Sequence, residues 1–242
     1  MSVILNLWST WMKAAVGPAA ARPLSAAMRA ASQQEHDAAE RSPFMRELIR
    51  GNLGKEGYAA YLLRLRIIYA ALEEAVRDHH DDPLIAAVCD PALERLPAVD
   101  ADLPHWTDGS SLKVDSPAAE SYRQRLESIR SGAALLAHHY TRYLGDLSGG
   151  QVIKRALDRV FSLGGIGLAF YDFPMQPKRY KDSYRARLDA LTLRADQVDI
   201  LLDEVKLAFR LNQTVLDELA VNWAAQCGQP DEPPSKMSSR DR

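Results

Sequence analysis

Apolar residues recur at three- and four-residue steps along most of the chain. Between residues 55 and 80 the positions on this spacing are Tyr58, Tyr61, Leu62, Leu65, Ile68, Tyr69, Leu72 and Val76. This is the spacing of one face of a helix. Nowhere do four to eight residues alternate between apolar and polar, as they do in a half-buried strand. The pattern therefore predicts an all-α protein.

Proline and glycine mark where several helices begin and end. Ser42 and Ser116 each stand as an N-cap before a proline, and Gly51 stands where the helix that starts at Phe44 should stop. Further helices are predicted over residues 23–41, 83–88, 118–130, 133–163, 177–193 and 195–226. Because the loops between them are short, we predict one helical domain over residues 23–227.

Composition and charge exclude several classes of protein. The 242 residues are 47% hydrophobic and 26% charged, and 30 Lys and Arg against 32 Asp and Glu give a net charge of −2. This balance gives no electrostatic reason to bind nucleic acid. The sequence contains no run of about 18 apolar residues, so it predicts no membrane span. Cys89 and Cys227 lack CxxC spacing, which excludes a cysteine-built zinc site and favours a reducing, cytoplasmic location.

The two ends of the chain differ from its middle. Residues 1–22 make a poor signal peptide, because Lys13 lies within or after the apolar stretch. We interpret them as an N-terminal extension, either a flexible or docking arm or the product of a start codon placed too early. Residues 228–242 are rich in proline and serine, so we expect a disordered tail.

Common catalytic motifs are absent from the sequence. It contains no GxxxxGK[ST], GxGxxG, GxSxG or HExxH. It also lacks ExxH, which disfavours the carboxylate di-iron site that helical bundles often carry.

One predicted helix contains residues that oppose helix formation. Gly145, Gly149 and Gly150 interrupt the periodic segment 133–163, and each glycine costs about 1 kcal/mol relative to alanine. Gly145 and Gly149 are four residues apart and share a face, which leaves bare backbone there and favours a bend over residues 148–150. Close helix packing or a simple helix break would explain this pattern. The alternative is a flat ligand that approaches the backbone.

The glycine segment carries a specific resemblance. Residues Tyr140–Gln151, YTRYLGDLSGGQ, are similar to the distal-helix motif of the haem (heme) oxygenase family, and we call them the distal motif. The similarity extends over roughly residues 23–222. The other matching segments are Phe44–Arg46, Tyr69–Glu74, Gly167–Phe170, Tyr184–Arg187 and Ala208–Asn212.

The resemblance implies a helical fold that holds haem between a proximal helix and a glycine-bent distal helix. It also implies an enzyme for which haem b is both substrate and cofactor. Such an enzyme opens the ring at the alpha meso carbon to biliverdin, ferrous iron and carbon monoxide. It requires O2 and an external electron donor, a redox partner that is either a flavoprotein reductase or a ferredoxin.

The resemblance assigns the iron ligand among the six histidines. His36 matches the family's proximal axial ligand. Glu40 follows one turn later, where its carboxylate could accept the other imidazole N–H, although a solvated helix charge is the alternative. We interpret the other histidines as structural: His79, His80, His105, His138 and His139.

The two haem propionates require a basic edge to the pocket. Lys181 and Arg185 lie four residues apart on one predicted helix face, a spacing that on its own is typical of a solvated surface pair. The resemblance implies that both meet the propionates, together with the phenol of Tyr140. Arg29 lies seven residues before His36, where the animal relatives have lysine, and is a further candidate.

The resemblance places the chemistry at Asp146. We expect it to form a distal network with Arg142 and Tyr69 and to hold a water that delivers a proton. A simple helix ion pair between Arg142 and Asp146 is the alternative. Gly145 and Gly149 provide the close approach to the ring. By family match, Phe170, Phe209 and Asn212 line or close the pocket, although core packing would explain them equally.

Two other functions fit parts of this pattern. A non-degrading haem carrier or sensor would need His36 and the basic edge, but it would not also need Asp146 and the distal glycines. Related helical enzymes act on thiamin or form quinones without haem, but neither cysteine matches a catalytic position. The distal motif favours the oxygenase over both.

Overall fold

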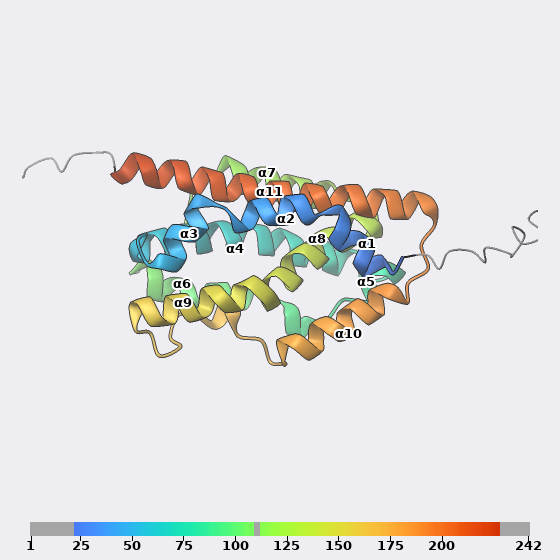
Figure 1. The fold of residues 1–242 in the computed structure, drawn as a ribbon, viewed down its shortest axis with the longest axis horizontal. Helices are drawn as coiled ribbons and strands as arrows, with labels where there is room; N and C mark the ends of the chain where they lie inside the picture. Colours follow the sequence, from blue (N-terminus) through green and yellow to red (C-terminus); the bar gives the residue numbers. More distant parts are fainter. Residues whose placement is uncertain (1–21, 109–111, 228–242) are drawn as a thin grey trace, which may run out of the picture.

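The computed structural model describes residues 22–108 and 112–227, with the side chains of Glu40, Gln226 and Cys227 left out. The interpretations of residues 1–21 and of the tail 228–242 lie outside these described residues. The described chain contains helices and no strand, so the all-α class is confirmed (Figure 1). No described helix is both long enough and apolar enough to cross a membrane.

The elements follow one another as short and long helices. The α-helices are α1 (Leu24–Ala31), α2 (Gln33–Glu40), α3 (Pro43–Arg50), α4 (Gly54–Asp78), α5 (Pro83–Ala86), α6 (Leu96–Thr107), α7 (Pro117–Ser128), α8 (Gly132–Gly145), α9 (Gln151–Phe161), α10 (Pro177–Asp189) and α11 (Ala195–Cys227). Two 3₁₀ turns, η1 (Pro91–Leu93) and η3 (Ala169–Tyr171), and one π-helical segment, η2 (Asp146–Gly150), complete the fold.

Helix α4 forms the centre of the molecule. It packs against α6 and α7, while the long α11 packs along α8 and also covers α2 and α3. In Figure 1, α2 lies in front of α11, and α8 and α9 run obliquely below it. The periodic positions of α4 are fully buried, including Leu62, Leu65, Ile68 and Leu72. Burial of each such side chain contributes roughly 2 kcal/mol, which explains why the three- and four-residue spacing determines the fold.

The predicted first helix is in fact two helices. The chain leaves α1 at Ser32, whose φ of −103° and ψ of 10° are not helical. The Ser32 hydroxyl donates to the Met28 carbonyl at 2.9 Å, a local bond that competes with the helix ladder. Arg29 and His36 consequently lie on separate helices and not two turns apart on one straight face.

Helix α6 was not predicted. Its sequence contains a proline near its start and another, Pro104, inside it, and prolines in such a pattern normally argue against a helix. The first proline lies in the first turn, where a missing amide proton costs no helical hydrogen bond. The helix ends at Thr107, soon after the second proline. The buried residues Val99, Leu103 and Trp106 hold α6 against the core. Tertiary packing thus overrides the local signal.

The predicted bend over residues 148–150 takes the form of a π-helical segment. Segment η2 begins at Asp146, directly after α8, and ends at Gly150, directly before α9 begins at Gln151. A π turn adds one residue per turn and often occurs at functional sites. The chain therefore passes from α8 to α9 without a loop, and the wider turn lies within the distal motif.

Candidate active site

A hydrogen-bonded group joins α4, α8 and η2. The hydroxyl of Tyr69 donates to Oδ2 of Asp146, and Arg142 donates from Nε and Nη2 to the same hydroxyl oxygen at 3.2 and 3.1 Å. All three side chains are buried. Tyr69 thus accepts from a cation and donates to an anion, which fixes the orientation of its hydroxyl proton.

Arg142 also connects this group to α11. Its Nη1 donates to Oδ1 of Asn212 at 2.6 Å, and its Nη2 lies 3.8 Å from Oδ1 of Asp146. Burial raises the pKa of the Asp146 carboxyl, although Arg142 and the Tyr69 hydrogen bond act in the opposite direction. We call Tyr69, Arg142, Asp146 and Asn212 the distal network. It contains the ion pair between Arg142 and Asp146 but extends beyond it.

Beside the distal network the backbone is open. Gly145 and Gly149 are both exposed, and a Cβ added to either would meet nothing within 4 Å. Gly150 differs, because a Cβ there would lie 3.2 Å from Cδ1 of Tyr171. Close packing of another helix therefore does not explain the first two glycines. The open side of the two glycines leaves the backbone accessible to a flat ligand.

His36 lies on α2 with about half of its side chain exposed, at 48%. Its ring meets Phe209 of α11 edge-on, with centroids 5.7 Å apart. Its Nδ1 is 3.8 Å from Oδ1 of Asp37. The side chain of Glu40, the expected partner of the imidazole, lies outside the described part of the chain. Phe209 thus lies beside the candidate ligand, as its expected pocket position requires.

Four groups form a basic edge at the end of this face: Arg29, Tyr140, Lys181 and Arg185. Lys181 donates to the hydroxyl of Ser148 in η2 at 2.8 Å, and Nη1 of Arg185 lies 3.3 Å from Asp182. Burial raises the pKa of Tyr140, while the charges of Arg185 and Arg29 partly offset that rise. Burial and the charge of Arg185 lower the pKa of Lys181. The cations therefore lie close enough to repel one another, and an anion between them would relieve that repulsion.

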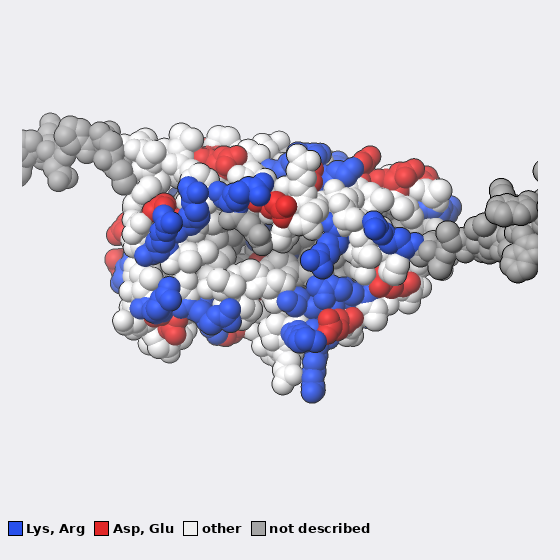
Figure 2. All heavy atoms as spheres, viewed as in Figure 1, with Lys and Arg blue, Asp and Glu red and all other residues white. Residues whose placement is uncertain are grey.

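Figure 2 shows the face formed by α1, α2, α8, α9 and α10, the same face that Figure 1 shows as ribbons. The surface is hollowed below α2, above α8 and α9. Lys and Arg gather over α10 and the neighbouring end of α1, and also over α3 and α9. The chain has almost no net charge, so this gathering is local and not a property of the whole surface.

Comparison with known proteins identifies the family. The model of the family described as heme oxygenase matches residues 22–218. This range includes the distal network, the open glycines, His36 and the basic edge. The chain belongs to the haem oxygenase family.

Relatives in animals and bacteria agree with this assignment. The chain is 36% identical over 208 residues to heme oxygenase 1 of Rattus norvegicus, covering 81% of this chain and 71% of that protein. It is 34% identical over 209 residues to heme oxygenase 2 of Synechocystis, covering 81% and 82%.

Solved structures match the fold as well. The crystal structure of heme oxygenase-2 from Synechocystis, in complex with heme and NO, superposes with a TM-score of 0.78 at 33% identity and covers 85% of this chain and 88% of that chain. Heme oxygenase from Leptospira interrogans gives a TM-score of 0.76 at 34% identity, covering 81% and 99%. The chain is therefore a haem-degrading oxidoreductase, and the alternative of a non-degrading carrier is not favoured.

The site of this haem oxygenase fits its substrate. Open backbone at Gly145 and Gly149 accommodates a flat ring, the exposed imidazole of His36 supplies a nitrogen donor, and the basic edge supplies charges for two carboxylates. Each of these features suits the chemistry of a different part of the haem molecule.

The two histidines next to the distal motif are buried inside the fold. Nε2 of His138 lies 2.7 Å from Glu204, and Nδ1 of His139 lies 2.8 Å from the Tyr184 hydroxyl. Burial lowers the pKa of both imidazoles, that of His139 to about 3. Both imidazoles are therefore engaged within the core, and His139 is neutral at pH 7. Phe170 is likewise buried, packed edge-on against Tyr69 with centroids 5.5 Å apart.

Several side chains at the site were not predicted. Ser148 holds Lys181, and Nε2 of Gln151 donates to the Tyr171 carbonyl at 2.9 Å. Both belong to the distal motif, but only the fold shows which partners they meet. Tyr58 and Tyr171 also lie behind η2. The position of Tyr58 could have been found from the helical spacing that it shares with Tyr69.

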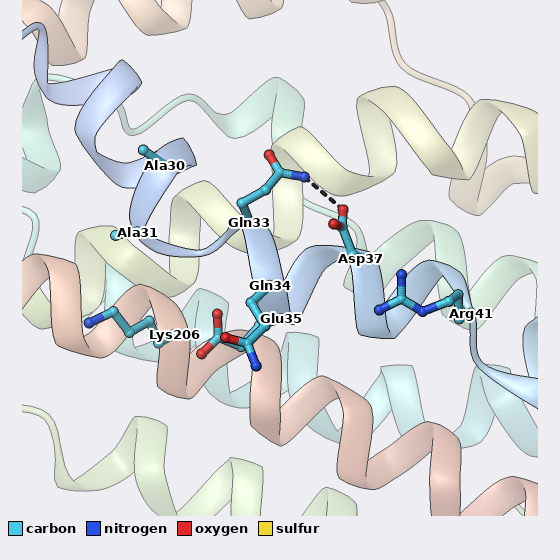
Figure 3. Close-up of a pocket in the computed structure, with 8 residues that line it drawn as sticks. All are labelled: Ala30, Ala31, Gln33, Gln34, Glu35, Asp37, Arg41 and Lys206. Carbon is cyan, nitrogen blue, oxygen red and sulfur yellow. Dashed lines mark hydrogen bonds between the residues drawn. The ribbon is translucent and has the colours of Figure 1, made fainter.

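A separate hollow of about 630 Å³ lies beside α1, α2 and α11 (Figure 3). It is lined by Ala30, Ala31, Gln33, Gln34, Glu35, Asp37, Arg41 and Lys206. Gln33 donates to Asp37 at 2.7 Å within it. None of these residues belongs to the distal network or the basic edge, but Oδ1 of Asp37 lies 3.8 Å from Nδ1 of His36.

Proposed function

We propose that this enzyme opens haem b at the alpha meso carbon to biliverdin, ferrous iron and carbon monoxide. The reaction uses O2 and electrons from a redox partner protein. The main support for this proposal is the distal network. In it the buried carboxyl of Asp146 is held by Tyr69 and Arg142, beside the exposed glycine backbone of the distal motif. A protein that only stores or senses haem has no use for such a carboxyl.

His36 is the axial ligand to the haem iron in this proposal. Its support is the exposed imidazole on α2, the edge contact with Phe209 and the hollow below α2. A histidine ligand also donates less electron density to the iron than a thiolate does, which disfavours early cleavage of the O–O bond. Glu40, if it orients the imidazole, would do so from the following turn of the helix.

The basic edge holds the propionates. Lys181 and Arg185 provide the charges on α10, Arg29 provides a third from α1, and Tyr140 provides a hydroxyl. Hydrogen bonds from charged donors to carboxylates are stronger than neutral ones. This edge therefore sets the in-plane orientation of the ring, and with it the meso carbon that faces the distal network.

Asp146 holds and delivers the proton. Tyr69 occupies Oδ2, which leaves Oδ1 to accept a hydrogen bond from a water on the open side of η2. Burial raises the pKa of the carboxyl, so Asp146 retains a proton at a higher pH than an exposed aspartate would. Arg142 and Asn212 keep the carboxyl and its neighbour in place. Gly145 and Gly149 allow the ring to approach this proton source.

The test is the absorption spectrum of the purified protein with added haemin. It is followed first without oxygen, then after admission of O2 with an electron donor and with catalase present to remove free peroxide. We expect a histidine-ligated spectrum that converts to that of biliverdin. Asp146→Ala should bind haem and lose biliverdin formation, and His36→Ala should lose the ligated spectrum. Haem that stays intact with competent donors would refute the proposal.

The electron donor is a separate protein in this proposal, either a flavoprotein reductase or a ferredoxin. The Lys and Arg side chains around the hollow provide a surface that an acidic partner could approach. We place the protein in the cytoplasm, where such donors are reduced. Replacement of one donor type by the other in the same assay identifies the class that supports turnover.

A further inference from the structure

Arg95 is a buried cation that is not part of the distal network. It directly precedes α6, and only 5% of the residue is exposed. Its guanidinium donates to four backbone carbonyls: from Nε to Leu93 at 2.8 Å, from Nη2 to Ala92 at 3.1 Å, and from Nη1 to Phe170 and Asp172 at 3.3 and 2.7 Å. In the described part of the chain no carboxylate forms an ion pair with it. Its charge is therefore solvated by carbonyl dipoles without being neutralised.

These bonds anchor the short helix η3 to the start of α6. Asp102, further along α6, holds η3 as well, because its carboxylate accepts from the amides of Ala169 and Phe170 at 2.9 and 2.7 Å. The Arg95 guanidinium also lies over the ring of Phe173, 4.0 Å from its centroid. The backbone of η3 is thus fixed at both of its ends.

Helix η3 packs in turn against η2 and the distal network. The ring of Phe170 meets the ring of Tyr69 edge-on, with centroids 5.5 Å apart. The ring of Tyr171 lies beside Gly150, where an added Cβ would be 3.2 Å from Cδ1 of Tyr171 and 3.7 Å from Cβ of Asp146. The backbone that carries these two rings is the backbone to which the guanidinium is bonded. The guanidinium is therefore held at a fixed position behind the carboxyl of the distal network.

The charges of Arg95 and Asp146 act on each other. Burial raises the pKa of the Asp146 carboxyl, while Arg142, the Tyr69 hydrogen bond and the charge of Arg95 lower it. Burial lowers the pKa of the Arg95 guanidinium, and the charge of Asp146 is the first of the charges that raise it. A protein interior screens such an interaction less than water does. Each group therefore stabilises the charged form of the other.

We propose that Arg95 is a positioning residue for Asp146, which anchors η3 behind the distal network and stabilises the Asp146 carboxylate by its charge. Arg95 makes no hydrogen bond to Asp146, so it acts through η3 and through its electric field. With this second cation the buried carboxyl holds its proton less tightly, and so releases it more readily to a water on the open side of η2. The proposal rests on the proposed role of Asp146 in proton delivery.

The first test leaves Arg95 in place and uses the protein without haem. The infrared band of the protonated Asp146 carboxyl, identified by its loss in Asp146→Asn, gives the apparent pKa of that group. The nitrogen NMR resonance of Nε in Arg95, assigned by through-bond correlation to its own backbone, is followed over the same pH range. We expect a change of this resonance with the same midpoint, because the two charges are coupled. A resonance that does not respond at that midpoint would overturn the proposal.

Other titratable groups near Arg95 and Asp146 are separated by the same experiment. Burial also raises the pKa of Glu73, which accepts from the Arg95 amide, and of Asp102. A change of the resonance that remains in Asp146→Asn belongs to these two carboxyls, and the change that disappears belongs to Asp146. The phenols that feel the charge of Asp146 stay protonated, because burial raises the pKa of each: Tyr58, Tyr61, Tyr69, Tyr122, Tyr143 and Tyr171.

The second test removes the charge. Arg95→Met should raise the apparent pKa of Asp146 in the infrared titration by about half a pH unit or more. Arg95→Lys keeps the charge and should restore most of that difference, although it cannot make all of the carbonyl bonds. Arg64→Met is the matched control, since Arg64 is 3% exposed and its Nε donates to Glu218 at 2.8 Å, outside the distal network. It should lower Tm and leave the titration unchanged.

Two results would refute the role of Arg95. One is an unaltered titration of Asp146 in Arg95→Met, and the other is an equal change in Arg95→Met and Arg64→Met, which would indicate a general loss of packing. If Arg95→Met does not fold, the NMR titration of the unsubstituted residue decides. Neither titration involves turnover. If both behave as expected while the enzyme forms no biliverdin, the proposed function fails and the effect of Arg95 on Asp146 stands.

Discussion

The hydroxyl of Tyr69 donates a hydrogen bond to the carboxylate of Asp146, and the two residues are 77 positions apart in the chain. This contact ties the centre of α4 to the first residue of the π-helical segment. The carboxyl therefore has a fixed orientation although it lies where the regular helix ends. A buried acid with a fixed orientation and an elevated pKa is well suited to proton delivery.

Tyr69→Phe should slow biliverdin formation about tenfold to a hundredfold while haem binding is retained. The Tyr69 hydrogen bond lowers the pKa of Asp146, so its loss should raise that pKa further and leave the carboxyl free to rotate. The rate of biliverdin formation is measured at saturating electron donor, and haem affinity is measured by spectral titration.

The matched control is Tyr184→Phe. Its hydroxyl is also buried and bonded, at 2.8 Å from Nδ1 of His139, but it does not contact the distal network. This variant should lose stability without a comparable loss of rate. Equal rates for Tyr69→Phe and the wild type would remove Tyr69 from the proton pathway.

Gly149→Ala should weaken haem binding about tenfold without destabilising the protein. A Cβ at this position meets no other atom within 4 Å, and alanine is the better helix former by about 1 kcal/mol. Tm of the haem-free protein should therefore stay equal or rise, while the added methyl occupies the space proposed for the ring.

Gly150→Ala, at the next residue, should have the opposite effect on Tm. Its Cβ would lie 3.2 Å from the Tyr171 ring, so the ring must shift and Tm should fall. A loss of haem affinity for Gly150→Ala but not for Gly149→Ala would place the ring against a different part of η2.

The distal motif predicted the candidate site from the sequence, because three glycines within a helical pattern are costly and carry a specific family resemblance. The helical periodicity of α4 likewise fixed the core, since Leu62, Leu65 and Ile68 are the positions that become buried. Both signals are local in the sequence, which is why the sequence alone was sufficient.

Contacts between residues far apart in the chain were harder to predict from the sequence. The break at Ser32 depends on one hydroxyl that bonds to Met28, and the same residue type is common inside helices. Asn212 was expected only to line the pocket, yet it accepts from Arg142 across 70 positions. Nothing in the spacing of two distant residues specifies such a pair. The fold alone brings them together.

Lys181→Ala should weaken haem binding about fivefold to tenfold, and more at low salt than at high salt. Lys181 lies at the basic edge and reaches Ser148 in η2. Lys178→Ala is the matched control on the same helix, since that side chain is 90% exposed and paired with Asp182. It should leave the affinity unchanged. Haem dimethyl ester, which lacks the carboxylates, should bind both variants and the wild type equally.

Glu204 on α11 joins three helices. Its carboxylate accepts from Arg125 of α7 at 2.5 and 2.8 Å and from His138 of α8 at 2.7 Å. Burial alone would raise the pKa of Glu204, but the hydrogen bonds and charges of these partners more than offset burial and lower the pKa to about 2. The ionised form is therefore bound more tightly in the folded protein than in the unfolded chain.

Glu204→Gln should lower the free energy of unfolding by about 2–3 kcal/mol at pH 7, because one partner of a buried ion pair is lost. A lowered carboxyl pKa stabilises the fold above the ordinary value of 4.5, and this contribution disappears as pH falls from there to about 2. The gap between wild type and variant, measured by urea unfolding, should therefore close over that pH range. Glu120→Gln is the control, because the pKa of Glu120 is also about 2 through Arg123 but its pair is exposed. A gap for Glu204→Gln as small as that for Glu120→Gln at pH 7 would show that the three helices are held by their apolar contacts alone.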